Sequence, residues 1–314
     1  MSDNATKNYL CEAVPPFNIA TAMEEASRCL LCHDAPCSRD CPAGTNPADF
    51  IRAIRFRNFK GASEIIRTNN VLGGICARVC PYEVLCEEGC SRSGIDKPIQ
   101  IGRLQRFATD YEKATNFKPL DKVEASKEKV AMIGSGPSSL TCAAELAQKG
   151  YDVTIFEEKA IAGGVLSYGV VPARLPQYVV DEEISIIKEL GVKIICNTKI
   201  GKDKSIEELK SEGFKAFFIG AGIQAPKMLN IPGTDLEGVT NAVEYLGKAK
   251  PSNGKMAPGK TVVVIGGGDV AMDCATTSKL LGSDRTMILY RRTREEAPAH
   301  KTEMSYVEEL GVQF

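Results

Sequence analysis

The chain has 314 residues, 43% of them hydrophobic and 25% charged, and a formal net charge of −1. This composition is typical of a globular protein of two or more domains, and the near-zero charge argues against nucleic-acid or anionic-membrane binding. The amino terminus lacks a signal-peptide pattern, and no apolar run approaches the roughly 18 residues of a membrane helix. We therefore expect a cytoplasmic protein. With only two histidines, triad hydrolysis is not expected.

The cysteines need an explanation in a reducing compartment. The chain has 12, and eight of them lie between Cys29 and Cys90. Because the cytosol keeps thiols reduced, ligation of a metal or cluster is a better interpretation than disulfides. The isolated cysteines are predicted to be buried core thiols: Cys11, Cys142, Cys196 and Cys274.

The first block of the chain, residues 1–126, places these cysteines between short amphipathic helices predicted over 19–31 and 47–59. A tight loop that holds three cysteines suits a [4Fe–4S] cluster, and a cysteine before proline often serves the neighbouring cluster. We therefore expect Cys29, Cys32 and Cys37 on one cluster and Cys41, which precedes Pro42, on a second. A structural zinc site is the alternative, although the spacings suit it less well. The second set of cysteines is Cys76, Cys80, Cys86 and Cys90.

The second block follows a polar linker predicted over 117–129 and opens as a strand, a glycine-rich turn and a helix. The turn is Gly134, Ser135, Gly136, Pro137 and Ser138, after the strand KVAMI. Its first glycine permits the tight turn, and its second lets the backbone approach a pyrophosphate at the helix amino end. Glu157 follows the next strand, where a carboxylate would accept hydrogen bonds from an adenosine ribose.

The third block repeats this pattern after a boundary at 255–259. Its turn is Gly266, Gly267, Gly268 and Asp269, after the strand TVVVI. Arg291 and Arg292 end the next strand, and guanidinium groups suit a 2′-phosphate, which favours NADPH over NADH. They could instead belong to a solvated basic surface, and Asp269 could simply stabilise the amino end of the helix.

Two dinucleotide turns in one chain indicate two dinucleotides, and FAD with NAD(P)H is the economical pair. We predict an α-helical [4Fe–4S] domain (1–126), then α/β Rossmann-type domains for FAD (127–255) and NAD(P) (256–314). Hydride would pass from the nicotinamide to the flavin, and the clusters would accept single electrons.

Three stretches carry a resemblance: EASRCLLCHDAPCSRDCPAGTNPADFIRAIRFRNFKGA, CARVCPYEVLCEEGC and PIQIGRLQRFATD. They resemble the NAD(P)H-oxidising small subunit of bacterial dihydropyrimidine dehydrogenase and the amino-terminal region of the fused mammalian enzyme. The glutamate synthase small subunit is a more distant relative. The resemblance runs from about Asn8 to the end of the chain and is specific in the cysteine block.

The resemblance implies ligands and contacts that spacing alone does not give. Spacing indicates Cys76 and does not find Gln105, a neutral ligand that should raise the potential of its cluster. The implied ligands are Cys29, Cys32, Cys37 and Cys90 for one cluster, and Cys41, Cys80, Cys86 and Gln105 for the other. The implied FAD contacts are Gly134 to Ser138, Glu157, Gly163, Gly164 and Arg174. The implied nicotinamide-nucleotide contacts are Gly266 to Asp269, Arg291 and Arg292.

The chain departs from the family pattern in three places. It reads GVVPARLP where the family has GIPxFRLP, which shifts the proline beside Arg174 to Pro172. Bacterial members usually use NADH, which opposes the argument from the arginines. The chain stops at 309–314, so we expect a fragment whose last nucleotide domain is incomplete.

The function predicted from these features is electron input. The partner would be an FMN-bearing catalytic subunit that reduces the 5,6 double bond of uracil or thymine, in a hetero-oligomer. The alternatives are the electron-input subunit of glutamate synthase or of a ferredoxin-linked transhydrogenase, and a non-catalytic cluster-bearing scaffold. A measurement of flavin content distinguishes these alternatives, because the scaffold would contain iron but no flavin that NAD(P)H bleaches.

Overall fold

The computed structural model describes residues 9–223, 225–226, 229 and 231–314. The chain forms two compact units. The larger unit comprises Val14–Ala162 and Tyr178–Ala221, and the smaller comprises Met1–Ala13, Gly163–Gln177 and Gly222–Phe314. No helix in the described ranges is both long and apolar enough to cross a membrane. The predicted division by cofactor, at residues 126 and 255, stays a prediction, because compactness alone does not locate a cofactor.

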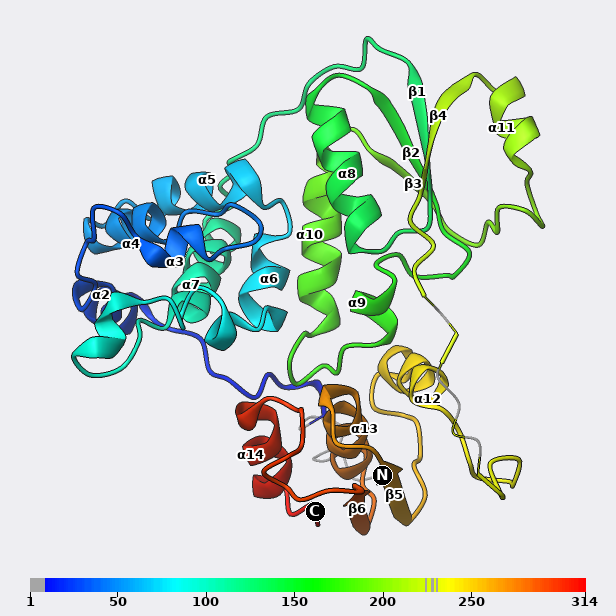
Figure 1. Cartoon of the computed structure of the whole chain (residues 1–314). Helices are drawn as coiled ribbons and strands as arrows, with labels where there is room; N and C mark the ends of the chain where they lie inside the picture. The colour runs from blue at the N-terminus through cyan, green and yellow to red at the C-terminus, as the bar shows by residue number, and fades with distance from the viewer. Residues whose placement is uncertain (1–8, 224, 227–228, 230) are drawn as a thin grey trace. The chain divides into compact units, whose positions relative to one another are not determined.

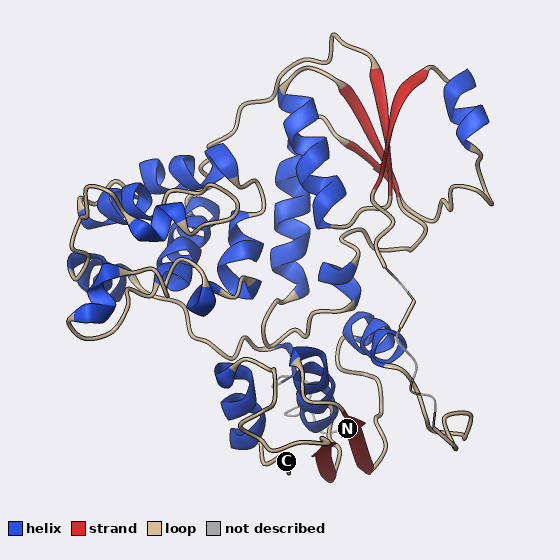
Figure 2. Ribbon diagram, in the orientation of Figure 1, coloured by secondary structure: helices blue, strands red, loops and turns tan. Residues whose placement is uncertain are grey.

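The larger unit begins with helices and loops, as the sequence predicts (Figure 2). Asn18, Asn46 and Asn58 each begin a helix by accepting a backbone N–H bond with the side chain. The apolar faces of these helices pack around one core that includes Ile51 and Leu104. The elements are α2 (Ile19–Ser27), α3 (Pro36–Arg39), α4 (Pro47–Arg55), α5 (Phe59–Asn69), α6 (Gly73–Val79), η1 (Tyr82–Val84), η2 (Ser91–Gly94) and α7 (Ile101–Ala114).

The two helices predicted from apolar spacing are present but end earlier than expected. The first stops at Ser27, and Leu31 then takes a left-handed backbone conformation with φ +54°. The second stops at Arg55, because Arg57 has φ +61° and turns the chain into α5. Apolar spacing continues through both turns, so the pattern alone cannot show where each helix ends.

A four-stranded parallel sheet completes the larger unit, in the order β3-β2-β1-β4. Helices α8 and α10 lie on one side of it and α11 on the other (Figure 1). The predicted linker contains no helix or strand between α7 and β1. The elements are β1 (Lys129–Ile133), α8 (Pro137–Gln148), β2 (Asp152–Phe156), α10 (Gln177–Glu189), β3 (Lys193–Ile195), α11 (Ile206–Ser211) and β4 (Phe214–Ile219).

The smaller unit contains a pair of parallel strands with helices around it. Its core includes Met272 and Ile288. Lys250 is buried and donates to the backbone carbonyls of Leu166 and Leu175, which ties two segments of this unit together. The elements are α9 (Val165–Tyr168), α12 (Ala242–Ala249), η3 (Lys250–Ser252), β5 (Thr261–Ile265), α13 (Asp269–Leu280), β6 (Arg285–Leu289) and α14 (Lys301–Glu309).

Candidate cofactor-binding sites

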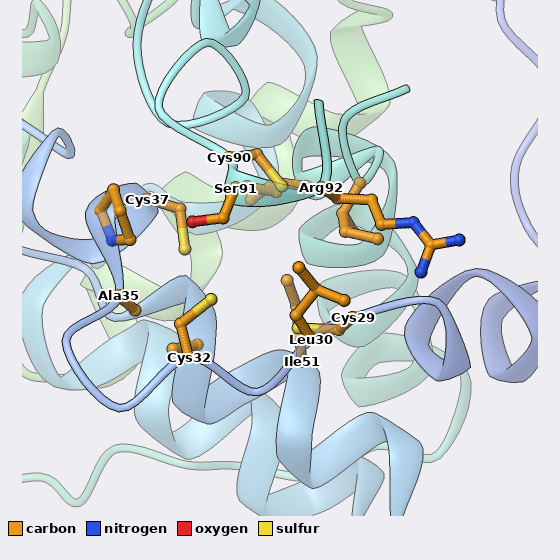
Figure 3. Close-up of a pocket in the computed structure, with 13 residues that line it drawn as sticks. Cys29, Leu30, Cys32, Ala35, Cys37, Ile51, Cys90, Ser91 and Arg92 are labelled. Atoms are coloured by element: carbon orange, nitrogen blue, oxygen red, sulfur yellow. The ribbon is translucent and has the colours of Figure 1, made fainter. Parts of the chain in front are cut away.

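The first group of predicted cluster ligands lies around one cavity. Cys29, Cys32 and Cys37 come from the loop after α2 and from α3, whereas Cys90 begins η2, far along the chain. All four line the same cavity, and Figure 3 shows the sulfur atoms of Cys32 and Cys37 pointing into it. The remaining lining is largely apolar, with Ile51 among its residues. The fold therefore brings together the four cysteines that the family resemblance implies for one cluster.

The electrostatics of this cavity suit a positively charged occupant. Burial raises the pKa of Cys37 to about 11, and the neighbouring thiols of Cys90 and Cys29 raise it further. Burial also raises the pKa of Cys29, with Cys90 and Cys32 adding to the effect. Four thiolates so close together would repel each other, and bound iron would offset that repulsion. The donor set and the apolar lining thus fit a [4Fe–4S] cluster.

A second group of cysteines forms around the carboxyl end of α6. Burial raises the pKa of Cys86 to about 12, and the nearby thiols that contribute include Cys41 and Cys76. The pKa of Cys80 is also raised, first by a hydrogen bond with Cys76 and then by burial, with Cys86 and Cys41 adding to it. Cys80 ends α6 in an extended conformation with ψ 136°, as expected for a residue before proline. The thiols of this group, Cys41, Cys76, Cys80 and Cys86, are therefore close enough to influence one another electrostatically.

Gln105 reaches this second site from α7. Its side chain is buried, and its amide Nε2 donates to the carbonyl oxygen of Gly73 at 2.8 Å. The pKa of the Cys76 thiol is lowered, first by a hydrogen bond with Cys80 and then, against the effect of burial, by hydrogen bonds with Asn70 and Gln105. The fold thus places the cysteine that spacing indicates and the glutamine that the resemblance implies along the same helix, α6, that Cys80 ends.

The two cysteine groups adjoin each other. The pKa of Cys86 in the second group is raised in part by Cys37 of the first. Cys29, Cys37, Cys86 and Cys90 also belong to or pack against the same apolar core. In the described part of the chain, no three Cys, His, Asp or Glu side chains are arranged to hold a metal ion. A [4Fe–4S] cluster takes one ligand at each of its four irons, so its ligands need not converge on a single point.

The four isolated cysteines do not all behave as predicted. Cys274 is buried, and Cys142 and Cys196 are half-buried. Cys142 and Cys274 lie on α8 and α13, just behind the glycine-rich turns, as expected. Cys11 is exposed, so the prediction of a core thiol there is wrong. It directly follows the helical residues Tyr9 and Leu10 and begins the irregular segment that leads to α2.

The first glycine-rich turn and Glu157 meet at one edge of the parallel sheet. Ile133 and Phe156 are register partners, so the residues after β1 and β2 lie side by side. Glu157 is buried and accepts hydrogen bonds from the backbone N–H and the hydroxyl of Ser135, at 2.8 and 2.5 Å. Gly134 has φ +92°, and a Cβ there would lie 2.6 Å from a backbone carbonyl oxygen. This edge therefore has the backbone freedom and the carboxylate that a dinucleotide requires.

The other implied FAD contacts, Gly163, Gly164 and Arg174, belong to the smaller unit. Arg174 forms ion pairs there with Asp273 of α13 at 3.2 Å and Glu303 of α14 at 3.1 Å. Burial raises the pKa of Asp273 to about 6 although Arg174 acts to lower it. To contact FAD, the guanidinium would have to share or exchange one of these carboxylate partners.

The second glycine-rich turn leads into α13 of the smaller unit. Gly266 has φ +141°, and a Cβ at Gly268 would meet no atom within 4 Å. Asp269 occupies the first turn of the helix and accepts a hydrogen bond from the backbone N–H of His300 at 2.8 Å. Its other carboxylate oxygen lies 2.8 Å from Nδ1 of the His300 ring. The carboxylate thus holds the start of α14 beside the turn, a role that the sequence did not indicate.

The arginine pair that the sequence assigns to a 2′-phosphate follows β6 directly. Arg291 and Arg292 are both exposed. Because β5 and β6 are parallel and in register from Thr261 to Ile265, the turn after β5 and the arginines after β6 lie at the same edge. This edge can present cations next to a bound dinucleotide.

Two family models match the chain. Residues 6–117 match dihydropyrimidine dehydrogenase domain II, 4Fe-4S cluster. Residues 128–314 match the pyridine nucleotide-disulphide oxidoreductase model. The boundary between them falls within the predicted polar linker.

Curated relatives extend the match over nearly the whole chain. The NAD-dependent dihydropyrimidine dehydrogenase subunit PreT of Escherichia coli K12 is 47% identical over 306 residues, which cover 98% of this chain and 74% of that protein. The chain belongs to this subunit family. The NADPH-Fe(3+) oxidoreductase subunit beta of Geobacter sulfurreducens is 38% identical over 291 residues, 90% of this chain and 42% of that protein.

Family membership confirms the predicted class, an NAD(P)H-dependent oxidoreductase with iron–sulfur clusters and FAD, and the order of its domains. Among solved structures, a 2-naphthoyl-CoA reductase complex aligns over 86% of this chain and 40% of that one, with a TM-score of 0.51 and 21% identity. That likeness supports the fold alone.

Proposed function

We propose that this chain takes electrons from NAD(P)H and passes them, through FAD and two [4Fe–4S] clusters, to an FMN-bearing partner that reduces uracil or thymine. The observation that carries the proposal is the first cavity. Four cysteines separated by up to 61 positions line it (90 − 29 = 61), as a four-thiolate cluster requires. The name of the Escherichia coli relative supports the pyrimidine partner.

The chain's own residues bind and orient the cofactors in this proposal. The cysteines would hold the clusters as thiolates, and the apolar lining of the first cavity would keep water from its cluster. Glu157 accepts hydrogen bonds from the FAD ribose, and the turns at Gly134 and Gly266 admit the pyrophosphates. When bound, the flavin converts a hydride into single electrons that the clusters carry. The proposed ligands and contacts remain those that the resemblance implies.

The choice of nicotinamide nucleotide depends on Arg291 and Arg292. Their exposed position after β6 supports contact with a 2′-phosphate, and thus NADPH. The Escherichia coli relative is named as NAD-dependent, and the Geobacter relative as an NADPH oxidoreductase subunit. We propose NADPH for this chain, and a cytoplasmic location, which cell fractionation would test.

The decisive experiment is anaerobic purification followed by iron, sulfide and flavin analysis. Two [4Fe–4S] clusters predict about eight irons per chain, with one flavin that NADPH bleaches. Addition of the FMN-bearing subunit should then permit reduction of uracil. Transfer of electrons to a glutamate synthase large subunit instead would favour the alternative partner. Zinc in place of iron would overturn the proposal.

A further inference from the structure

Helix α6 presents one face to the second cysteine site. Gly73, Cys76 and Cys80 are spaced three and four residues apart, so they lie along the same side of the helix. The backbone N–H of Cys80 donates to the carbonyl of Cys76 at 3.0 Å, which places Cys80 directly one turn beyond Cys76. Helix α7 packs against α6 and supplies Gln105, which is bonded to Gly73 at one end of this face. Gln105 and Cys80 therefore lie at opposite ends of the face, with Cys76 between them.

The face carries two thiols, Cys76 and Cys80, and Gln105 is bonded to the backbone at its first residue. Cys76 lies one turn beyond Gly73, whose carbonyl accepts the hydrogen bond from Gln105, and one turn before Cys80. The ligands that the resemblance implies for this cluster are Cys41, Cys80, Cys86 and Gln105, and Cys76 is a further thiol on the same face of α6. Thiolate is the softer donor and the usual ligand of iron in such clusters, whereas an amide oxygen is a weaker one.

We propose that Cys76 is a reserve ligand for the iron that Gln105 holds. This inference rests on the proposed function, because it assumes that a [4Fe–4S] cluster binds here. The hydrogen bond to the Gly73 carbonyl uses the nitrogen of the Gln105 amide and leaves its oxygen as the donor to iron. Cys76 lies on the same helix face as Gly73, one turn beyond the carbonyl that Gln105 binds, so it is the thiol of α6 placed to substitute for that amide.

The exchange is a ligand substitution with no change of oxidation state. The Cys76 thiol would release its proton to solvent and hold the iron through its sulfur, in place of the Gln105 oxygen, which would leave. One neutral ligand is replaced by one anionic ligand, so the site gains one negative charge. A more negative cluster is harder to reduce, so its potential should fall.

The test compares four variants of the full chain, purified anaerobically: Gln105→Leu, Cys76→Ala, the double variant, and Cys142→Ala as a control. Leucine is close to glutamine in volume, and Cys142 is a half-buried thiol on α8, away from the cysteine sites. The measurements are iron and sulfide content, the electron paramagnetic resonance spectrum after reduction, and circular dichroism as a check on folding.

The proposal predicts that Gln105→Leu keeps about eight irons per chain, with an altered resonance spectrum and a lower potential. Cys76→Ala and Cys142→Ala should keep the normal iron content and spectrum. The double variant should lose iron from the second site while retaining its fold and the iron of the first site.

Three results would overturn the proposal. Gln105→Leu could lose as much iron as the double variant, which would mean that Cys76 cannot reach the cluster. The double variant could keep all its iron, which would mean that neither residue is needed. Cys76→Ala could lose iron while Gln105→Leu does not, which would make Cys76 the native ligand. Absence of clusters from the unmodified chain would instead refute the proposed function.

Discussion

Arg67 is the centre of a buried ion-pair network, and its removal should destabilise the larger unit strongly. The guanidinium pairs with Glu112 of α7 at 3.1 Å and with Glu183 of α10 at 2.6 Å, and the three side chains are 2 to 5% exposed. Burial acts to lower the pKa of Arg67, but Glu183 and Glu112 outweigh it and raise that pKa. Burial raises the pKa of Glu112 although Arg67 opposes this.

The change Arg67→Met leaves two buried carboxylates without their cation. Loss of one partner from a buried ion pair costs about 3–5 kcal/mol, and two stranded acids place the expected loss near the upper end. Burial raises the pKa of Glu112, so without Arg67 this carboxyl can bind a proton in the folded state at a pH above that at which it does so in the unfolded chain. The loss should therefore shrink as the pH falls from about 7 towards 5.

Hydrogen exchange resolved by peptide is the suitable assay, because a single unfolding midpoint would average two compact units. Peptides from α5, α7 and α10 should open more readily in Arg67→Met. The control is Arg52→Met, which breaks an exposed pair with Asp49 at 3.2 Å that is worth about 0–1 kcal/mol. Equal effects of the two substitutions would refute the reasoning.

Three further predictions concern the nucleotide-binding edges. Gly134→Ala should destabilise the sheet edge, because the added Cβ would clash with the backbone of a neighbouring segment. Gly136→Ala is the control and should fold normally, and thermal unfolding of the two variants tests the difference. Alanine at both Arg291 and Arg292 should weaken NADPH binding by about 10-fold or more but spare NADH, and equal losses in titration would contradict the 2′-phosphate assignment. Asp273, with its pKa raised to about 6, should make stability fall as pH rises from about 4 to 6. Urea unfolding of Asp273→Asn between these two pH values should show a free energy of unfolding without this pH-dependent contribution.

Sequence patterns predict the strands and turns of this chain well, because each is a local feature. A short apolar run followed by glycines leaves few conformations other than a strand and a tight turn. The same patterns place Glu157 correctly beside the first turn, because parallel strands in register end at the same edge. Helix ends are predicted less well, since a positive φ at Leu31 or Arg57 has no signal in apolar spacing.

The contacts that define the cluster sites depend on distant parts of the chain. Cys90 joins the first cavity only because η2 folds back onto the loop after α2, where Arg92 donates to the carbonyl of Arg28. Gln105 lies on a different helix from every cysteine, and no spacing rule would single it out. The ion pairs of Arg67 were likewise not predicted, because a charged residue in an amphipathic helix is usually exposed.

The adjacency of the two cysteine sites makes their charges interdependent. Cys37 of the first site contributes to the raised pKa of Cys86 in the second site. Both residues belong to or pack against the same apolar core, where charges interact more strongly than in water. Two clusters with four thiolates each would therefore oppose each other's reduction. A neutral Gln105 amide in place of one thiolate makes the total charge of the two clusters less negative by one. Replacement of Gln105 by Cys76 would add that negative charge back. The choice between Gln105 of α7 and Cys76 of α6 at one iron would thus affect how readily both sites are reduced.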